Sequence, residues 1–421
     1  MSEQEWKRLE AVGRVERGAL TNVQAAQILG VSERQVRRLR RRVQEQGRAG
    51  VVHGNAGRVS AQRLAQGVRE LIVELRSTKY AGFNDRHFTE KLVEVEQLLV
   101  SRGTVRRVLR AAGIESPRRR RASKHRRRRE RKAQEGLLLL WDGSHHDWLE
   151  GRGPTLCLMG SVDDATGQLL AGAHFVEQEC AAGYLRVIKE IAQEMGLPWS
   201  LYMDRHGSLK RNDDHWTLEE ELRGEQEPTQ VGRALKALEI EVIYALSPQA
   251  KGRVERLWGT LQDRLVSELR LVGAGTAAQA NAVLERFRPD YNHRFAVTAA
   301  QTVPAWRKIR AGTDLARVCS FCYAATVLND NTVRLGGVVI DIPPGPRQRS
   351  YAHACVEVRQ LLDGSWRVYY RDALIATAAS TATGELRSLN RRRRWVGRAT
   401  SGKTCVRPQG RLLTADMAIL K

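Results

Sequence analysis

The segment SPQAKGRVERLWGTLQDRLV, residues 247–266, constrains this chain more than any other part of its sequence. Its apolar residues recur at spacings of three and four, which predicts an amphipathic helix with one buried face. Pro248 and Gly252 keep that helix from extending backwards, so Glu255 is expected in the first turn, near a fixed helix end. The positions of the buried face are Val254, Leu257, Trp258, Leu261, Leu265 and Leu269.

Two more carboxylates end apolar, strand-like runs upstream: Asp142 in LLLLWDG and Asp204 in WSLYMDRHG. Hard divalent cations prefer oxygen ligands, and two Mg²⁺ ions about 3.5–4 Å apart can activate water and stabilise a leaving 3′ oxygen. Two strand aspartates and a helical glutamate therefore predict a site with two Mg²⁺ ions for phosphodiester chemistry. We expect Asp142 to bridge both ions, and Asp204 and Glu255 to hold one each.

Each of these carboxylates has an ordinary alternative role. An aspartate at a strand end is commonly a turn or cap residue, and a glutamate in a first turn complements the helix dipole. Asp163 and Asp164 are rival acidic residues, but the following Ala-Thr-Gly predicts that they form a turn. For three nearby histidines we favour a supporting or structural role over metal ligation. They are His145, His146 and His206.

The charge of the chain predicts a polyanionic partner. Lys and Arg number 70 against 47 Asp and Glu, a formal net charge of +23, and nucleic acid is the commonest ligand of so basic a protein. No apolar run approaches the ~20 residues that span a bilayer, and the N-terminus lacks a signal-peptide core. We therefore expect a cytoplasmic protein with nucleic acid, not a membrane, as its partner; an anionic membrane surface is the weaker alternative.

The six cysteines fit reduced thiols. Cys319 and Cys322 form a C-x-x-C without a second half at standard ligand spacing, so a zinc site is an alternative that we do not favour.

The segment from Thr21 to Val43 has the rhythm of a helix-turn-helix. Gly30 and Val31 make the turn, and Ser32 is placed to cap the next helix with Gln35 as its reciprocal partner. Val36, Leu39 and Val43 would point inward in that second helix. The outward polar residues, which we expect to contact DNA, are Arg34, Gln35, Arg37, Arg38, Arg41 and Arg42. A solvated basic helix in an ordinary bundle is the alternative.

A second helical unit, with a less clear turn, is expected from about residue 61 to residue 113. Ser101 would cap its last helix, burying Val105, Val108 and Leu109 and exposing Arg102, Arg106 and Arg107 towards DNA. The run RRRRASKHRRRRERK, residues 118–132, is interpreted as a linker that follows DNA, with Arg126 and Arg127 as contacts; a solubilising spacer is the alternative.

An α/β pattern follows. The expected strands are 137–144, 155–163, 168–176, 199–204 and 240–244, and the expected helices are 180–195, 229–238 and 277–288. Three strands, helix, strand, helix, strand, helix is the order of the ribonuclease H-like fold. The acidic tract 212–228 is predicted as a mobile loop near the active site, and residues 291–297 as a closing loop. Short runs after residue 326 predict a small, SH3-like barrel.

These observations predict a multidomain protein: N-terminal all-α helix-turn-helix units, a central α/β ribonuclease H-like core and a small C-terminal all-β barrel. The expected boundaries are 1–60 for the helix-turn-helix domain, 61–116 for the second helical domain, 117–135 for the basic linker, 136–300 for the catalytic core, 301–325 for a connector, 326–385 for the barrel and 386–421 for a basic tail.

At WDGSHHDW, YMDRHG and especially SPQAKGRVERLWGTLQDRLV the chain resembles the ISNCY group of bacterial insertion-sequence transposases, in the superfamily of DDE transposases and retroviral integrases. The resemblance runs from the helix-turn-helix to about Val297, and more loosely beyond it. It implies that Asp142, Asp204 and Glu255 are the catalytic triad. It also implies recognition of transposon terminal repeats, use of Mg²⁺ or Mn²⁺, and a multimer that synapses two DNA ends.

The chain departs from the retroviral pattern at two points. The gap between the aspartates is 62 residues (204 − 142), but the gap from Asp204 to Glu255 is 51 residues (255 − 204), longer than is typical of integrases, and the acidic tract accounts for the excess. No zinc-binding His/His/Cys/Cys module precedes the core.

Lys251 and Arg253 flank Glu255, and contact with DNA is favoured for both over a plain surface charge. Trp258 is interpreted as a core residue, not as a base-stacking platform.

Three functions therefore compete. The leading hypothesis is a transposase that cleaves DNA and transfers a 3′-OH end into target DNA. The second is a catalytically silent DNA-binding regulator derived from one, which loss of a carboxylate would favour. The third is a nuclease of the ribonuclease H type, which would not need two helix-turn-helix units.

Overall fold

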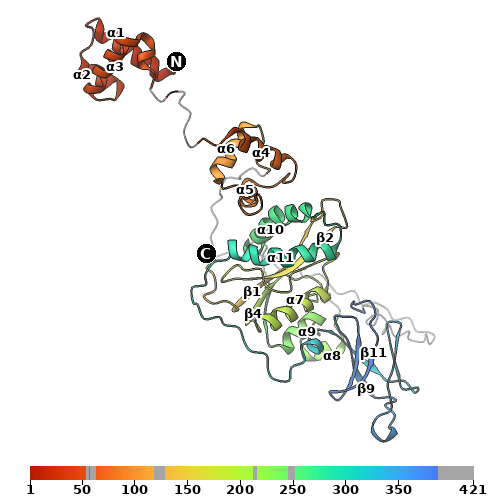
Figure 1. The fold of residues 1–421 in the computed structure, drawn as a ribbon. Coiled ribbons are helices and arrows are strands. Elements are labelled where there is room, and N and C mark those ends of the chain that lie inside the picture. Colours follow the sequence, from red (N-terminus) through yellow and green to blue (C-terminus); the bar gives the residue numbers. More distant parts are fainter. Residues whose placement is uncertain (54–55, 57–62, 118–128, 212–215, 245–251, 387–421) are drawn as a thin grey trace, which may run out of the picture. The chain divides into compact units, whose positions relative to one another are not determined.

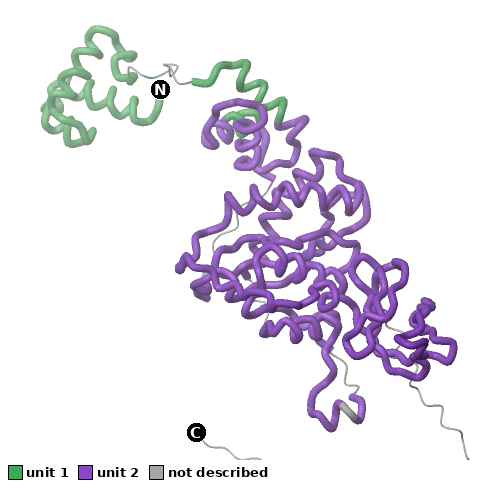
Figure 2. Tube along the Cα trace, turned by 60° about the horizontal axis from the view of Figure 1, so that its bottom comes forward, with its two compact units in different colours: residues 1–75, 108–112 green, residues 76–107, 113–421 purple. Residues whose placement is uncertain are grey.

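A computed structural model describes residues 1–53, 56, 63–117, 129–211, 216–244 and 252–386 (Figure 1). The chain forms two compact units, residues 1–75 with 108–112 and residues 76–107 with 113–421 (Figure 2). The expectations for Arg126, Arg127, Lys251 and the tail from residue 387 onward lie outside the described residues. The domain boundaries given above stay predictions.

The first unit begins with three helices, α1 (Glu3–Glu16), α2 (Asn22–Leu29) and α3 (Glu33–Gln46), followed by a 3-10 turn, η1 (Gly47–Val51). Val15, Ala25, Ala26 and Val36 form their core. Gly30 ends α2 in the left-handed conformation, at φ 63°, which a glycine adopts without strain, so the predicted turn is confirmed. Helix α4 (Gln66–Ser77) follows, and nearly all of it belongs to this unit.

The cap of α3 is simpler than predicted. The Ser32 hydroxyl accepts a hydrogen bond from the Gln35 backbone N–H at 3.3 Å. The two-way bonding of a capping box is found instead at the start of α2, between Thr21 and Gln24.

The second unit is built on a five-stranded sheet. Its strands are β1 (Leu138–His146), β2 (Leu156–Asp163), β3 (His174–Val176), β4 (Ser200–Met203) and β5 (Glu241–Tyr244), in the order β3-β2-β1-β4-β5. Strands β1, β2 and β3 pair antiparallel, whereas β4 is parallel to β1 and β5 is parallel to β4.

Helices cover both faces of this sheet (Figure 1). Helices α7 (Ala181–Glu194) and α9 (Gln230–Ala237) pack on one face, where they meet Leu139 and Trp141 of β1. Helices α10 (Gly252–Leu271) and α11 (Ala277–Phe295) pack on the other, where they meet Leu138 and Leu140. Successive strand residues point to opposite faces, so both sides of β1 are buried. The predicted succession of strands and helices is confirmed, with one further helix, α8 (Leu218–Arg223).

Three local predictions were wrong. The third strand is confined to His174–Val176, because Leu169 makes only an isolated bridge to Val162. The acidic tract contains α8, whose first turn Thr217 and Glu220 cap reciprocally. The expected loop 291–297 is mostly helical, because α11 continues through Pro289 to Phe295.

The continuation of α11 has a packing reason. Phe287, Tyr291 and Phe295 recur every four residues, and their rings pack in sequence along the helix. Asn292 hydrogen-bonds both the N–H and the carbonyl of Leu169, at 2.8 and 3.0 Å. These contacts outweigh the backbone hydrogen bond that proline cannot donate.

Helix α5 (Asp85–Glu94) packs against α10 and α11 within the second unit. His87, almost wholly buried, lies 2.7 Å from a Glu268 oxygen, and Lys91 reaches the same carboxylate. Arg264 of α10 forms an ion pair with Glu90. Helix α6 (Arg102–Ala111) follows, and its Val105, Val108 and Leu109 are buried as predicted.

The C-terminal region is rich in β structure. Strands β6 (Phe321–Thr326), β9 (Cys355–Gln360), β10 (Trp366–Tyr370) and β11 (Ala373–Ala378) form an antiparallel sheet in the order β11-β10-β9-β6. Strands β7 (Thr332–Leu335) and β8 (Val338–Asp341) form a separate hairpin. The ladders of the described strands do not join these two sheets, so the predicted barrel is not confirmed.

This region shares a hydrophobic core with the α7 face of the central sheet. Gln230 of α9 exchanges two hydrogen bonds of 2.9 Å with the backbone of Cys322. Among the described residues, no helix combines the length and the apolar character needed to cross a membrane.

Candidate active site and DNA-binding helices

The pairing of β1 with β4 sets the levels of the two predicted aspartates. Leu138 pairs with Ser200, Leu139 with Leu201 and Leu140 with Tyr202, a constant offset of 62 residues (200 − 138). Asp142 and Asp204 differ by the same 62 residues (204 − 142). Asp204 therefore follows β4 at the level that Asp142 occupies on the neighbouring strand.

The same face of the sheet is favoured for both aspartates. Leu138 and Leu140 face α10, and the next residue of that alternating series is Asp142. On β4, Tyr202 packs against the α10 core while Leu201 and Met203 pack against α7. Asp204 comes two residues after Tyr202, so the alternation along the strand places it on the same, α10-facing side. Its carboxylate accepts a 3.1 Å hydrogen bond from the His206 backbone N–H.

Helix α10 is tied directly to Asp142. The indole N–H of Trp258 donates to Asp142 Oδ2 at 2.9 Å. Gly160 is the register partner of Asp142 on β2, and a Cβ there would lie 3.3 Å from Ala173 Cβ and 3.4 Å from Trp258 Cη2. Trp258 is 5% exposed, which confirms it as a core residue, and it also orients an acidic side chain that the sequence had not linked to it.

Glu255 lies in the first turn of α10, is exposed to solvent and precedes Trp258 by one helical turn. Residues three apart on a helix lie on the same side, so Glu255 projects from the side of α10 that contacts Asp142.

The start of α10 is anchored by Asp164, which is wholly buried. Asp164 forms ion pairs with Arg253 of α10 and with Arg129, and it accepts a 2.8 Å hydrogen bond from the Lys132 N–H. Asp163 accepts hydrogen bonds from the Thr166 N–H and hydroxyl, as predicted for a turn former. The guanidinium of Arg253, a predicted DNA contact, is thus engaged within the protein.

A fourth acidic residue, Glu179, was missed by the sequence reasoning. The Tyr184 hydroxyl donates to Glu179 Oε1 at 2.5 Å. Burial, with the negative charges of Glu179, Asp204 and Asp142, raises the pKa of Tyr184 well above its usual value of 10.0. Of these three carboxylates, Glu179 contacts the phenol directly, and Asp204 and Asp142 act on it through their charges. Glu179 lies just before α7 without a strand or helix motif of its own, so no sequence pattern marks it.

Two of the three nearby histidines meet Glu179. His145 Nε2 and His206 Nδ1 each lie 3.5 Å from one of its oxygens. His146 instead packs its ring edge-on against Trp148.

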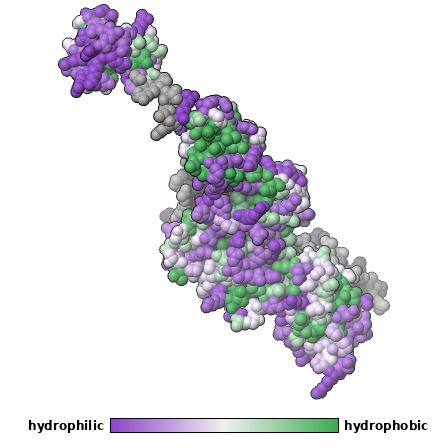
Figure 3. All heavy atoms as spheres, viewed as in Figure 1, coloured by the Kyte–Doolittle hydropathy of each residue, from purple (hydrophilic) through white to green (hydrophobic). Residues whose placement is uncertain are grey.

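The helix-turn-helix exposes most of the residues predicted to contact DNA. Val36 and Leu39 are buried, Val43 is half-buried, and Arg34, Gln35 and Arg38 are exposed on α3. Figure 3 shows mostly hydrophilic side chains over α1, α2 and α3 in its view. Arg37 and Arg41 are exposed but paired with Glu33 and Glu45, and Arg42 donates to the Val52 carbonyl at 2.6 Å.

Arg102, Arg106 and Arg107 are exposed on α6. Arg102 also lines a groove that α5 and α10 share in the second unit. Its polar lining comes from Asn84, Asp85, Arg86, Arg102, Ser116, Glu255, Arg256, Thr260, Asp263 and Arg264. The groove thus holds one predicted DNA-contact residue, Arg102, and the predicted catalytic glutamate, Glu255.

Among the described residues, one group of histidine, cysteine and carboxylate side chains is close enough to hold a metal ion, and it consists of His145, Cys157 and Glu179. Cys319 and Cys322 are free cysteines and belong to no such group among the described residues. The structure therefore offers no support for a zinc site at the C-x-x-C.

Comparison with known proteins identifies the N-terminal domain and the family of the chain. Residues 7–58 match the family model described as a helix-turn-helix domain. The putative transposase y4bF of Sinorhizobium fredii is 39% identical over 317 residues, which cover 75% of this chain and 68% of that protein. The transposase for insertion sequence IS1202 of Streptococcus pneumoniae is 30% identical over 337 residues, 69% of this chain and 68% of that protein.

Solved structures give weaker matches. A chain of the simian T-cell lymphotropic virus intasome in complex with PP2A regulatory subunit B56 gamma is 13% identical, covers 74% of this chain and 99% of its own, and has a TM-score of 0.29. The HTLV-2 integrase catalytic core domain in complex with magnesium is 16% identical, with a TM-score of 0.24 and coverage of 36% and 85%. TM-scores this low do not establish a shared fold. With two relatives at 30% identity or more, aligned over two thirds of their length, the chain belongs to the insertion-sequence transposases.

Proposed function

We propose that this chain is an active DNA transposase, which cleaves DNA at transposon ends and joins the freed 3′-OH to target DNA with Asp142, Asp204 and Glu255 as its catalytic triad. The observation that most supports this is the common 62-residue offset of the β1–β4 ladder and of the two aspartates, together with the Trp258–Asp142 hydrogen bond. The first observation supports Asp142 and Asp204 at the same level of neighbouring strands, and the second supports α10, which carries Glu255, as the helix beside Asp142.

The residues present suit hard divalent cations, because the donor set is made of carboxylate oxygens. Asp142, Asp204 and Glu255 would hold two Mg²⁺ ions, or Mn²⁺, which supply charge neutralisation and an activated water for phosphodiester cleavage. Trp258 would keep the Asp142 carboxylate in one orientation. The Asp164–Arg253 ion pair would fix the start of the helix that carries Glu255.

The DNA partner is proposed to be double-stranded, as terminal repeats and as target. Helix α3 would read the terminal repeat in the major groove through its exposed Arg34, Gln35 and Arg38. Arg102, Arg86 and Arg256 would contact phosphates along the groove beside Glu255. A dimer or higher multimer would bring two ends together. The proposed location is the bacterial cytoplasm, at the nucleoid.

The test uses a labelled duplex that carries one end of the element from which the chain derives. Wild type, Glu255→Gln and Glu285→Gln are compared with Mg²⁺ or Mn²⁺. Glu285 is an exposed glutamate of α11, so its substitution is a matched control. We expect nicking and strand transfer by wild type and Glu285→Gln, and neither by Glu255→Gln, while all three bind the end equally.

The alternative function is a silent DNA-binding regulator. If all three proteins bind the end and none cuts it with any divalent cation, the regulator takes the place of the transposase. If Glu255→Gln cuts as fast as wild type, the catalytic role of Glu255 is refuted.

A further inference from the structure

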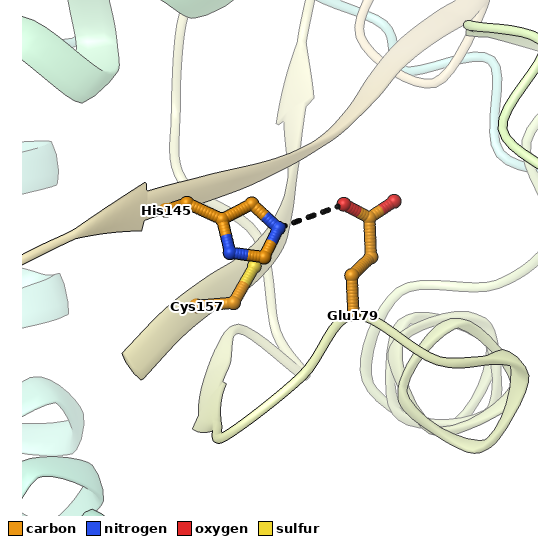
Figure 4. A group of neighbouring side chains, drawn as sticks. All are labelled: His145, Cys157 and Glu179. Carbon is orange, nitrogen blue, oxygen red and sulfur yellow. Dashed lines mark ion pairs between the residues drawn. The ribbon is translucent and has the colours of Figure 1, made fainter. Parts of the chain in front are cut away.

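We propose that His145, Cys157 and Glu179 form a binding site for a thiophilic divalent cation, best suited to Zn²⁺, separate from the three carboxylates of the catalytic triad. Figure 4 shows the three side chains converging from β1, from β2 and from the segment before α7. Their ligand atoms all lie within 4.8 Å of one another.

The sheet register places two of the donors together. His145 and Cys157 are direct partners in the antiparallel ladder of β1 and β2, so their side chains leave the same face of the sheet side by side. The third donor is Glu179, in the segment before α7, and its Oε2 lies 3.5 Å from His145 Nε2. Donors bound tetrahedrally to Zn²⁺ lie about 3.3–3.7 Å apart, so a small adjustment would complete the arrangement.

Gly143 keeps the centre of the cluster open. A Cβ on Gly143 would lie 2.7 Å from Glu179 Oε2 and 3.0 Å from Cys157 Sγ, so the carboxylate would have to move away from the cluster. The Tyr184 hydroxyl holds the other oxygen, Oε1, and so leaves Oε2 turned towards the imidazole. This is the supporting hydrogen bond that orients a metal-binding carboxylate.

The site lies on the opposite face of β1 from the catalytic aspartate. Asp142 contacts Trp258 on the face of the sheet that α10 covers. Side chains alternate along β1, so Gly143 and His145 lie on the other face with Trp141, whose ring stacks on Tyr184 of α7. The histidine side chain is 59% exposed and the glutamate 11%, which gives an ion a route from solvent.

The donor chemistry separates the two sites. Imidazole and thiolate suit Zn²⁺ and Co²⁺, whereas Mg²⁺ requires oxygen ligands. Burial, with the charges of Glu179 and Asp142, raises the pKa of the Cys157 thiol to about 12. A bound Zn²⁺ would displace its proton, as metals do with coordinating thiols. Binding would clamp β1, β2 and the start of α7 together.

The experiment titrates the purified, chelator-treated full chain with Co²⁺, which reports a thiolate ligand by a charge-transfer band. The variants are Cys157→Ser and His145→Ala, with Cys355→Ser and His146→Ala as matched controls. Cys355 is an exposed cysteine of β9, and His146 is exposed and points to the other face of β1.

We expect one equivalent of Co²⁺ to give the band in wild type and in both controls, and the band to vanish in Cys157→Ser. Because Cys157 is wholly buried, that variant must also retain the wild-type circular dichroism spectrum. The exposed His145 gives an independent test: His145→Ala should weaken Co²⁺ and Zn²⁺ binding at least about tenfold relative to His146→Ala.

The proposal is overturned if wild type shows no thiolate band, if the band survives in Cys157→Ser, or if His145→Ala binds as tightly as His146→Ala. These readouts do not depend on DNA cleavage, so they stand apart from the proposed transposase activity.

Discussion

Replacement of Asp164 by asparagine tests how the start of α10 is held. Asp164 is wholly buried, and its partners Arg253 and Arg129 are 16% and 50% exposed. Removal of one partner from a buried ion pair costs about 3–5 kcal/mol, because the other charge is left without compensation. Arg129 can turn to water, and asparagine keeps one acceptor for the Lys132 N–H. We therefore expect Asp164→Asn to lower the free energy of unfolding by about 2–3 kcal/mol.

The assay is urea denaturation followed by tryptophan fluorescence, because Trp141, Trp148 and Trp258 are all buried in this unit. A double-mutant cycle with Arg253→Met should give a coupling of about 1–3 kcal/mol, since the double variant leaves neither charge buried alone. Arg256→Met, at an exposed position one turn on, is the control and should change stability by less than about 0.5 kcal/mol.

Two results would refute this reasoning. One is an Asp164→Asn protein as stable as the Arg256→Met control. The other is strict additivity of the two single effects in the double variant. If Arg253→Met lowers stability but leaves affinity for transposon-end DNA unchanged, Arg253 acts on the protein and its predicted contact with DNA is wrong.

Four other variants, one of them a double substitution, test separate parts of the structure. Trp258→Phe should slow Mg²⁺-dependent DNA cleavage about tenfold or more, because a hydrogen bond to a charged acceptor contributes about 1.5–3 kcal/mol. The control is Trp148→Phe, which removes a hydrogen bond to the Ser144 carbonyl. Equal cleavage rates for the two variants would contradict the role of Trp258. Leu261→Ala, at a wholly buried position of α10, should cost about 2–5 kcal/mol in urea denaturation, and a cost below about 1 kcal/mol would show that its core collapses around the cavity. Burial opposes ionisation of Glu357, but Arg359 and Arg317 outweigh it and lower the pKa of Glu357 from 4.5 to about 2. Because the folded pKa is depressed, ionised Glu357 stabilises the fold above pH 4.5, and this contribution is lost as the pH falls towards 2. The difference in unfolding free energy between wild type and Glu357→Gln should therefore shrink over that range, and a difference that grows would contradict the argument. Replacement of both Arg34 and Arg38 by alanine should weaken binding to transposon-end DNA relative to the control Arg14→Ala on α1. The slope of log affinity against log salt concentration should fall by about 0.9 for each phosphate that the variant no longer neutralises. Unchanged affinity would favour the alternative, a solvated helix that does not contact DNA.

The sequence by itself determined the elements whose patterns repeat over a few residues. The apolar spacing from Val254 to Leu269 predicted α10, and the alternation and length of apolar runs predicted four of the five core strands closely. Gly30 and Ser32 predicted the turn and cap between α2 and α3. Such patterns can be read locally, because helix and strand periodicity and capping depend on neighbours within a few positions.

Only the tertiary structure decided which distant residues meet. The expected helix 277–288 ended before Pro289, yet packing of Tyr291 and Phe295 and the bonds of Asn292 to Leu169 carried α11 on to Phe295. The Trp258–Asp142 bond and the Asp164–Arg253 pair join residues 116 and 89 positions apart. The meeting of His145, Cys157 and Glu179 depends on strand register and on the path of the chain into α7, and no spacing in the sequence encodes either.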